Sequence, residues 1–188
     1  MAVPEERRYT AEEFYALTGE ERCELIDGYI VDMSPSPNFI HQEISAQMHT
    51  DIMNFIRSQK GKCKALATFD VHLNDNTVVE PDLLVACDPD KFDSKKHLGA
   101  PDWVIEIVSP SNFSNDYYTK LQLYKEHGVR EYWIVDPRNC HVTVHIHDGD
   151  FNAIDIYSFS DKIPVYIFKD KTPPLEICIA DYTESLEN

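Results

Sequence analysis

Two segments of the chain are mostly apolar over the length of a β-strand, residues 78–86 and residues 103–108. Such segments occupy the middle of a sheet that is covered on both sides, so a central sheet flanked by helices is expected. Carboxylates interrupt both segments, Asp82 in the first and Glu106 in the second. Because charged groups avoid burial unless they are paired or bind a metal, these residues become candidates for a functional site.

Helical periodicity and turn residues predict the elements around this sheet. Thr10 and Glu13 can form a capping box for a short helix ending near Gly19, and longer helices are predicted over residues 40–61 and 113–127. Further strands are predicted at residues 23–26, 29–33, 63–73, 132–135, 142–146 and 151–156, with hairpin turns at residues 27–28 and 148–149. This order predicts one mixed α/β domain over residues 1–188, with its core at about residues 10–180.

The net charge of the chain restricts its partners. Lys and Arg number 17 and Asp and Glu number 33, which gives a formal charge of −16. Such a chain repels nucleic acid at long range, so a nucleic-acid function would require a local basic site or a bound metal ion. No segment reaches the roughly 20 apolar residues of a membrane span, and the first residues are charged, so we expect a cytoplasmic protein without membrane contact.

The cysteines do not follow the spacing of a disulfide framework or a thiolate zinc site. There are five of them, an odd number, and none belongs to a Cys-x-x-Cys pair. We therefore expect reduced, small core residues at Cys23, Cys63, Cys87, Cys140 and Cys178.

Asp82 and Glu106 are far enough apart in sequence to meet on neighbouring strands. Their sequence separation of 24 leaves room for a strand, a surface connection and a return strand. Alternation places Glu106 on the same strand face as Val104 and Val108. Two converging carboxylates suit Mg²⁺, which takes one or two protein oxygens and fills its other positions with water and phosphate oxygens. Phosphodiester hydrolysis would also require a cation close to the reacting groups.

Pro81-Asp82 followed by Glu106-Ile107-Val108 resembles the PD-(D/E)xK signature of the restriction-endonuclease-like superfamily. The chain also resembles the bacterial Uma-family putative endonucleases. This resemblance rests on residues 24–28, 109–111 and 128–137 and on Asp116, Lys120 and Tyr124. It extends over about residues 10–180. The resemblance implies a restriction-endonuclease-like core, a mixed central β-sheet flanked by helices, with an N-terminal β-hairpin and a C-terminal β-hairpin extension.

The resemblance also implies the parts of an active site. Asp82 and Glu106 would bind Mg²⁺, for which Mn²⁺ can substitute, and DNA would be the substrate. The superfamily Lys, two residues after the Glu, is replaced here by Val108. Lys120, one turn after Asp116 in the predicted helix, would supply the cation instead. A homodimer would allow both DNA strands to be cut.

Three further residues are candidates for an auxiliary role. Glu24 lies on the predicted hairpin, where a solvated edge residue is the alternative. His41 opens the predicted long helix, where it can equally be a semi-buried structural histidine. Glu80 precedes Pro81 and could add a second carboxylate to the cleft. His141, His145 and His147 share a strand face, which is typical of a half-exposed strand and only weakly indicates zinc.

Two other functions remain open at the level of sequence. A catalytically inactive nuclease-fold module for binding or assembly agrees with Val108 and with the charge of −16. A metal-dependent hydrolase of small phosphate esters is less hindered by that charge, because a small ligand can enter a locally neutralised cleft. Metal-dependent binding of DNA would favour the nuclease over both alternatives.

Overall fold

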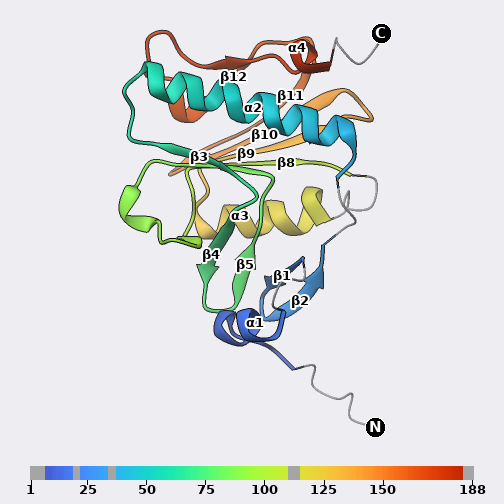
Figure 1. Cartoon of the computed structure of the whole chain (residues 1–188). Helices are drawn as coiled ribbons and strands as arrows, with labels where there is room; N and C mark the ends of the chain where they lie inside the picture. The colour runs from blue at the N-terminus through green and yellow to red at the C-terminus, as the bar shows by residue number, and fades with distance from the viewer. Residues whose placement is uncertain (1–6, 19–21, 34–36, 110–114, 184–188) are drawn as a thin grey trace.

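The computed structural model describes residues 7–18, 22–33, 37–109 and 115–183, which form two large sheets, a small two-stranded sheet and the helices between and around them (Figure 1). The first sheet has five strands in the order β2-β1-β5-β4-β7, and the second has six in the order β11-β10-β9-β8-β6-β3. Two helices lie on opposite faces of the six-stranded sheet, and the five-stranded sheet lies beyond the second of them (Figure 1).

The five-stranded sheet contains the N-terminal hairpin. Its strands are β1 (Cys23–Ile26), β2 (Tyr29–Asp32), β4 (Asp70–Asn74), β5 (Thr77–Val79) and β7 (Lys96–Leu98). Asp27 and Gly28 turn the β1-β2 hairpin with positive φ angles of 50° and 85°, as the sequence predicts. Helix α1 (Ala11–Thr18) packs on this sheet through Phe14, and the predicted capping box between Thr10 and Glu13 is confirmed.

The six-stranded sheet is mixed. Its strands are β3 (Lys64–Ala67), β6 (Leu83–Ala86), β8 (Trp103–Ile107), β9 (Glu131–Asp136), β10 (His141–Asp148) and β11 (Phe151–Ser158). Strands β8 and β9 run parallel, and the other neighbouring pairs in this sheet are antiparallel. The predicted C-terminal hairpin is therefore part of the main sheet, at its β10-β11 edge.

Helices α2 (Phe39–Ser58) and α3 (Leu121–His127) cover the two faces of this sheet. The apolar stripe of α2, which includes Ile44 and Met48, packs against Trp103 and Trp133. The other face packs against α3, which follows a π-helical turn, η2 (Asn115–Lys120). Shorter elements complete the fold: η1 (Pro89–Lys91), β12 (Ile163–Pro164), η3 (Tyr166–Phe168), β13 (Glu176–Ile177) and α4 (Ala180–Thr183).

Two segments predicted as single strands are each divided between the two sheets. Residues 63–73 form β3 and β4, which separate at Thr68, where φ is 46°. Residues 78–86 form β5 and β6, which separate around Pro81, a residue without the N–H that a continuing ladder would require. Side-chain alternation in the sequence cannot reveal that a segment is divided between two sheets, because each part of the segment still alternates as a strand does. Asp82 therefore lies where the chain passes from one sheet to the other.

The expectation of five reduced core cysteines is wrong. Lys64 of β3 pairs with Ala86 of β6, so Cys63 and Cys87 face each other at the next position of the ladder, and a disulfide joins them. Cys140 is exposed, whereas Cys23 and Cys178 are half-buried. Cysteine number and local spacing contain no information on strand pairing, which is what brings Cys63 to Cys87.

Within the described ranges, none of the helices combines the length and the apolar character that crossing a bilayer requires.

Candidate active site

Asp82 and Glu106 meet at one end of the β6-β8 pair. The antiparallel register pairs Leu83 with Ile105, and its continuation by one residue places Asp82 opposite Glu106. Asp82 Oδ2 accepts a hydrogen bond of 2.7 Å from the backbone N–H of Ile107, which ties the carboxylate to β8. Glu106 lies on the α3 side of the sheet together with Val104, as alternation along the strand predicts.

Lys120 points into the protein and contacts two carboxylates. Its Nζ lies 2.9 Å from Glu106 Oε1 and 3.0 Å from Glu24 Oε1. The exposed fractions of the three side chains are only 3% for Lys120, 5% for Glu106 and 3% for Glu24. Glu24 comes from β1 of the five-stranded sheet and Glu106 from β8 of the six-stranded sheet, so Lys120 joins the two sheets. The partner expected for Lys120 on its own helix, Asp116, has a side chain outside the described part of the chain.

His41 borders the carboxylate pair from the start of α2. Asn38 caps this helix by accepting a hydrogen bond of 3.0 Å from the backbone N–H of His41. The imidazole Nε2 of His41 then lies 3.1 Å from Asp82 Oδ2. The Asp82 side chain is 20% exposed, so this end of the site is the more open one.

Glu80 contributes its backbone to the site. Its N–H donates a hydrogen bond of 3.1 Å to Glu24 Oε1, whereas its carboxylate forms an ion pair of 3.2 Å with Arg22. The contact with Arg22 is an exposed one, and such pairs contribute little to stability. Among the described contacts, the Glu80 side chain therefore belongs to the rim of the site.

Tyr124 is a site residue that reasoning from the sequence did not identify as one. Its hydroxyl donates a hydrogen bond of 2.9 Å to Glu106 Oε1, and the side chain is fully buried. Tyr124 follows Lys120 by four residues, so both side chains project from the same side of the helix. A tyrosine four residues after the candidate catalytic lysine is the sequence signal that could have identified Tyr124.

The donor set fits a hard divalent cation. Two carboxylates, from Glu24 and Glu106, contact the ammonium group of Lys120, and Asp82 lies opposite Glu106 on the neighbouring strand, so acidic groups outnumber the ammonium group in this cluster. The described residues include no group of three or more His, Cys, Asp and Glu side chains arranged around one metal position. Asp82 and Glu106 alone would be sufficient for Mg²⁺, which keeps several waters or substrate oxygens, whereas zinc sites use at least three protein ligands.

His145, in the middle of the strand face with three histidines, has a structural role. His145 is buried and stacks against Tyr132 and His147, with ring centroids 6.1 and 6.2 Å away. Burial, with a smaller effect from the neighbouring His147, lowers the pKa of His145 to about 4. His145 is therefore uncharged at neutral pH and packs as an aromatic ring.

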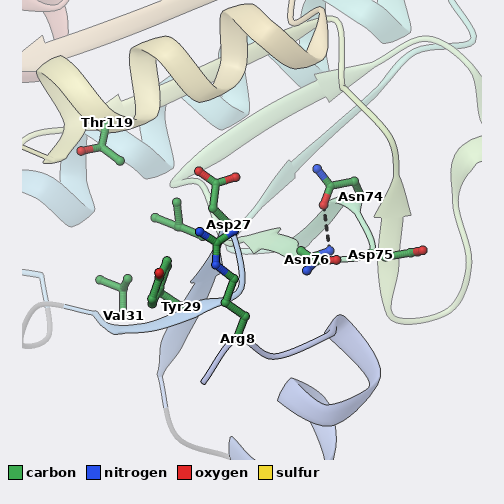
Figure 2. Close-up of a pocket in the computed structure, with 9 residues that line it drawn as sticks. Arg8, Asp27, Tyr29, Val31, Asn74, Asp75, Asn76 and Thr119 are labelled. Carbon is green, nitrogen blue, oxygen red and sulfur yellow. Dashed lines mark hydrogen bonds between the residues drawn. The ribbon is translucent and has the colours of Figure 1, made fainter. Parts of the chain in front are cut away.

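A cavity of about 800 Å³ opens beside the helix residue Thr119 (Figure 2). Figure 2 shows Arg8 and Asp27 together on one side of it and the hydrogen-bonded turn residues Asn74 and Asn76 on the other. Asp82 and Glu106 do not line it. This cavity is a neighbour of the carboxylate cluster and not part of it.

Comparison with known proteins gives a family and a fold. Residues 11–167 match the Uma2 family, which is described as putative restriction endonuclease. An uncharacterized protein of Synechocystis sp. is 27% identical over 149 residues, which are 76% of this chain and 76% of that protein.

The fold is shared with a protein of Anabaena variabilis, whose crystal structure is described as that of a putative nuclease belonging to DUF820. The TM-score is 0.76 at 23% identity, over 94% of this chain and 98% of that one. The two sheets flanked by helices confirm the expected mixed α/β fold class. Since the family match extends over most of the sequence, this chain belongs to the Uma2 family.

Proposed function

We propose that this protein is a Mg²⁺-dependent endonuclease that hydrolyses phosphodiester bonds in DNA, and that Mn²⁺ can replace Mg²⁺. One observation carries the proposal: Asp82 lies opposite Glu106, and the ammonium group of Lys120 lies 2.9 Å from Glu106. Membership of a family described as putative restriction endonuclease, and a fold shared with a protein described as a putative nuclease, support the same assignment.

Asp82 and Glu106 would hold the metal ion through their carboxylate oxygens. When bound, the ion supplies Lewis acidity that eases deprotonation of water and offsets negative charge on the phosphoryl group. His41 and the N–H of Ile107 fix the orientation of Asp82, and Tyr124 and Lys120 fix that of Glu106. The carboxylates are thus preorganised by hydrogen bonds before substrate arrives.

Lys120 would act as a hydrogen-bond donor and a positive charge. An ammonium group has three donors and no acceptor, so in this state it can orient the attacking water or stabilise the phosphate but cannot take a proton from water. In the reaction the water oxygen forms a bond to phosphorus and releases a proton to solvent, while the ester bond on the opposite side breaks and the leaving oxygen takes up a proton from solvent. The products are a phosphate monoester end and a hydroxyl end.

The acidity of the chain makes metal dependence a requirement for binding as well. DNA approaching the cluster of Glu24, Asp82 and Glu106 meets negative charge, in addition to the overall charge of −16. A divalent ion at Asp82 and Glu106 would reverse this local repulsion. Affinity for DNA is therefore expected only in the presence of a divalent cation.

A plasmid-nicking assay tests the proposal. Supercoiled DNA is incubated with the purified protein in Mg²⁺, Mn²⁺ or EDTA, and the wild type is compared with Asp82→Asn and Glu106→Gln. Nicking in Mg²⁺ and Mn²⁺, its absence in EDTA, and its loss in both variants are expected. Asp90→Asn, which changes an exposed carboxylate in η1, serves as the control and should nick DNA normally. Metal-dependent nicking that persists in both site variants would overturn the assignment.

One observation favours a second candidate, a catalytically inactive module for binding or assembly. Lys120 is buried between two carboxylates, as in an ion pair that serves stability alone. Such a module would bind no DNA at low or high salt, with or without Mg²⁺, whereas the nuclease would show metal-dependent affinity that weakens with salt. A homodimer, measured by sedimentation, is compatible with both functions.

A further inference from the structure

A cavity of about 200 Å³ lies at the carboxyl ends of the two parallel strands of the main sheet. Val108 and Ser109 follow β8, Pro137 and Arg138 follow β9, and all four line it. The first turn of α2 closes the cavity through Ile40 and His41. Ligands of open α/β sheets bind in such crevices outside the carboxyl ends of parallel strands.

The cavity adjoins the carboxylate cluster. His41, which lines it, lies 3.1 Å from Asp82, and Val108 is two residues beyond Glu106 in the same strand direction. The other ring nitrogen of His41, Nδ1, is buried and makes no hydrogen bond with a described residue. His41 thus joins the wall of the cavity to the carboxylate cluster.

A buried carboxylate holds the loop that presents Arg138. Asp136 is 1% exposed, and its Oδ1 accepts hydrogen bonds from the backbone N–H groups of Arg138, at 3.0 Å, and Asn139, at 3.1 Å. Its Oδ2 accepts a further bond of 2.8 Å from the Asn139 side chain. The position of Arg138 at the mouth of the cavity is therefore built into the fold, because a buried charge is costly unless it is bonded in this way.

The guanidinium group of Arg138 is not used in the described part of the chain. Arg130 forms ion pairs with Asp102 at 3.1 Å and with Asp148 at 3.0 Å, whereas Arg138 is exposed and pairs with no described carboxylate. Arg138 therefore places a positive charge on the wall of the cavity that His41 also lines. A guanidinium group presents donors in a fork that matches two phosphate oxygens.

We propose that this cavity binds the DNA phosphate next to the scissile one, with Arg138 donating to its oxygens. The apolar walls formed by Ile40, Val108 and Pro137 would receive the adjoining sugar, and the start of α2 adds the favourable dipole of a helix N-terminus. The inference rests on the proposed endonuclease function and extends it, because it assigns Arg138 as a residue that positions the substrate.

Binding can be measured without cleavage by replacing Mg²⁺ with Ca²⁺. A fluorescein-labelled DNA duplex is titrated with the full-length protein, and anisotropy is recorded at several KCl concentrations. Arg138→Ala should weaken binding about tenfold and reduce the slope of log K against log[KCl] by about one. Arg138→Lys should retain part of the affinity. Arg57→Ala, which removes an exposed cation at the far end of α2, should bind as the wild type does.

A second measurement locates the contact on the DNA. Neutral methylphosphonates replace single phosphates along the duplex, and each substituted duplex is titrated with wild type and Arg138→Ala. One position next to the cleavage site should weaken binding by the wild type and have little further effect on the variant. This loss of additivity identifies two groups that contact each other.

The outcomes separate this inference from the proposal on which it rests. If the wild type binds DNA and Arg138→Ala behaves as Arg57→Ala does, or if no methylphosphonate position couples to Arg138, the phosphate site is overturned and the endonuclease proposal stands. If the wild type binds no DNA with Ca²⁺ or with Mg²⁺, both are overturned. Because Arg138 is exposed, unchanged thermal unfolding of the variants will show that they are folded.

Discussion

The ammonium nitrogen of Lys120 lies 2.9 Å from Glu106 Oε1, although the two residues are 14 positions apart and belong to a helix and a strand. Glu24, from the other sheet, lies 3.0 Å from the same nitrogen. Burial removes water from all three charged groups, which costs free energy. The attraction between them stabilises the fold only where it exceeds this cost. Removal of one member therefore has effects that can be measured independently of any activity.

Replacement of Lys120 by Met is expected to destabilise the protein by about 3–5 kcal/mol, because two buried carboxylates lose their compensating charge. The measurement is urea-induced unfolding followed by circular dichroism. Lys125→Met, which changes an exposed lysine in the following helix α3, is the control and should have a small effect. Equal stability of the two variants would show that the Lys120 cluster does not stabilise the fold.

Replacement of Tyr124 by Phe removes the hydroxyl that donates to Glu106. The loss of a hydrogen bond to a charged group is expected to lower the free energy of unfolding by about 1.5–3 kcal/mol. If the nuclease assignment holds, kcat for cleavage should fall while KM changes little, because Tyr124 acts through Glu106 and does not touch DNA. Tyr118→Phe, at a tyrosine that is 73% exposed, should change neither quantity.

Local elements of the fold could be predicted from the sequence, whereas the contacts of the Lys120 cluster could not. The long helix, predicted over residues 40–61 and found over residues 39–58, and the two hairpins have local signals: an apolar stripe at helical spacing and turns at residues 27–28 and 148–149. The face of Glu106 followed from simple alternation along β8. These elements need no knowledge of which strand lies beside which.

The features that the sequence did not predict depend on long-range pairing. For Glu24 the sequence left a site role and a solvated hairpin edge both open; the residue is 3% exposed, because β1 lies between β2 and β5 and faces Lys120. The division of residues 78–86 between two sheets, and the meeting of Cys63 with Cys87, arise in the same way. Period-two patterns define a strand and its faces, but they do not define its neighbours.

His145 should make stability depend on pH. Its ordinary pKa of 6.5 applies in the unfolded chain, whereas in the folded protein burial lowers the pKa to about 4. Between these values the unfolded state binds the extra proton, so the free energy of unfolding decreases as the pH falls from about 6.5 towards 4. Urea unfolding at several pH values in this range measures this dependence.

His145→Gln isolates this contribution, because glutamine does not titrate. The variant should lose part of the pH dependence that the wild type shows below pH 6.5, even if it is less stable at neutral pH. Parallel stability curves for wild type and variant would contradict the assignment of a depressed pKa to His145.

Reduction of the Cys63–Cys87 disulfide should destabilise the protein. The bond closes a loop of 24 positions, and its removal is expected to cost about 3 kcal/mol through the greater entropy of the unfolded chain. Thermal unfolding with and without a phosphine reductant measures this effect, and mass spectrometry after alkylation verifies the bond. Cys140→Ser, at an exposed free cysteine, should retain the full response to reductant, whereas Cys63→Ser should show none.

Because Lys120 is held by Glu24 from β1 and by Glu106 from β8, the polar centre is complete only when both sheets are docked. Partial opening of the N-terminal hairpin would withdraw Glu24 and leave Lys120 with one fewer partner, while the large sheet and α2 kept their packing. The candidate active site is thereby coupled to the most N-terminal strands, and removal of those strands would disrupt the Lys120 cluster before it unfolded the core.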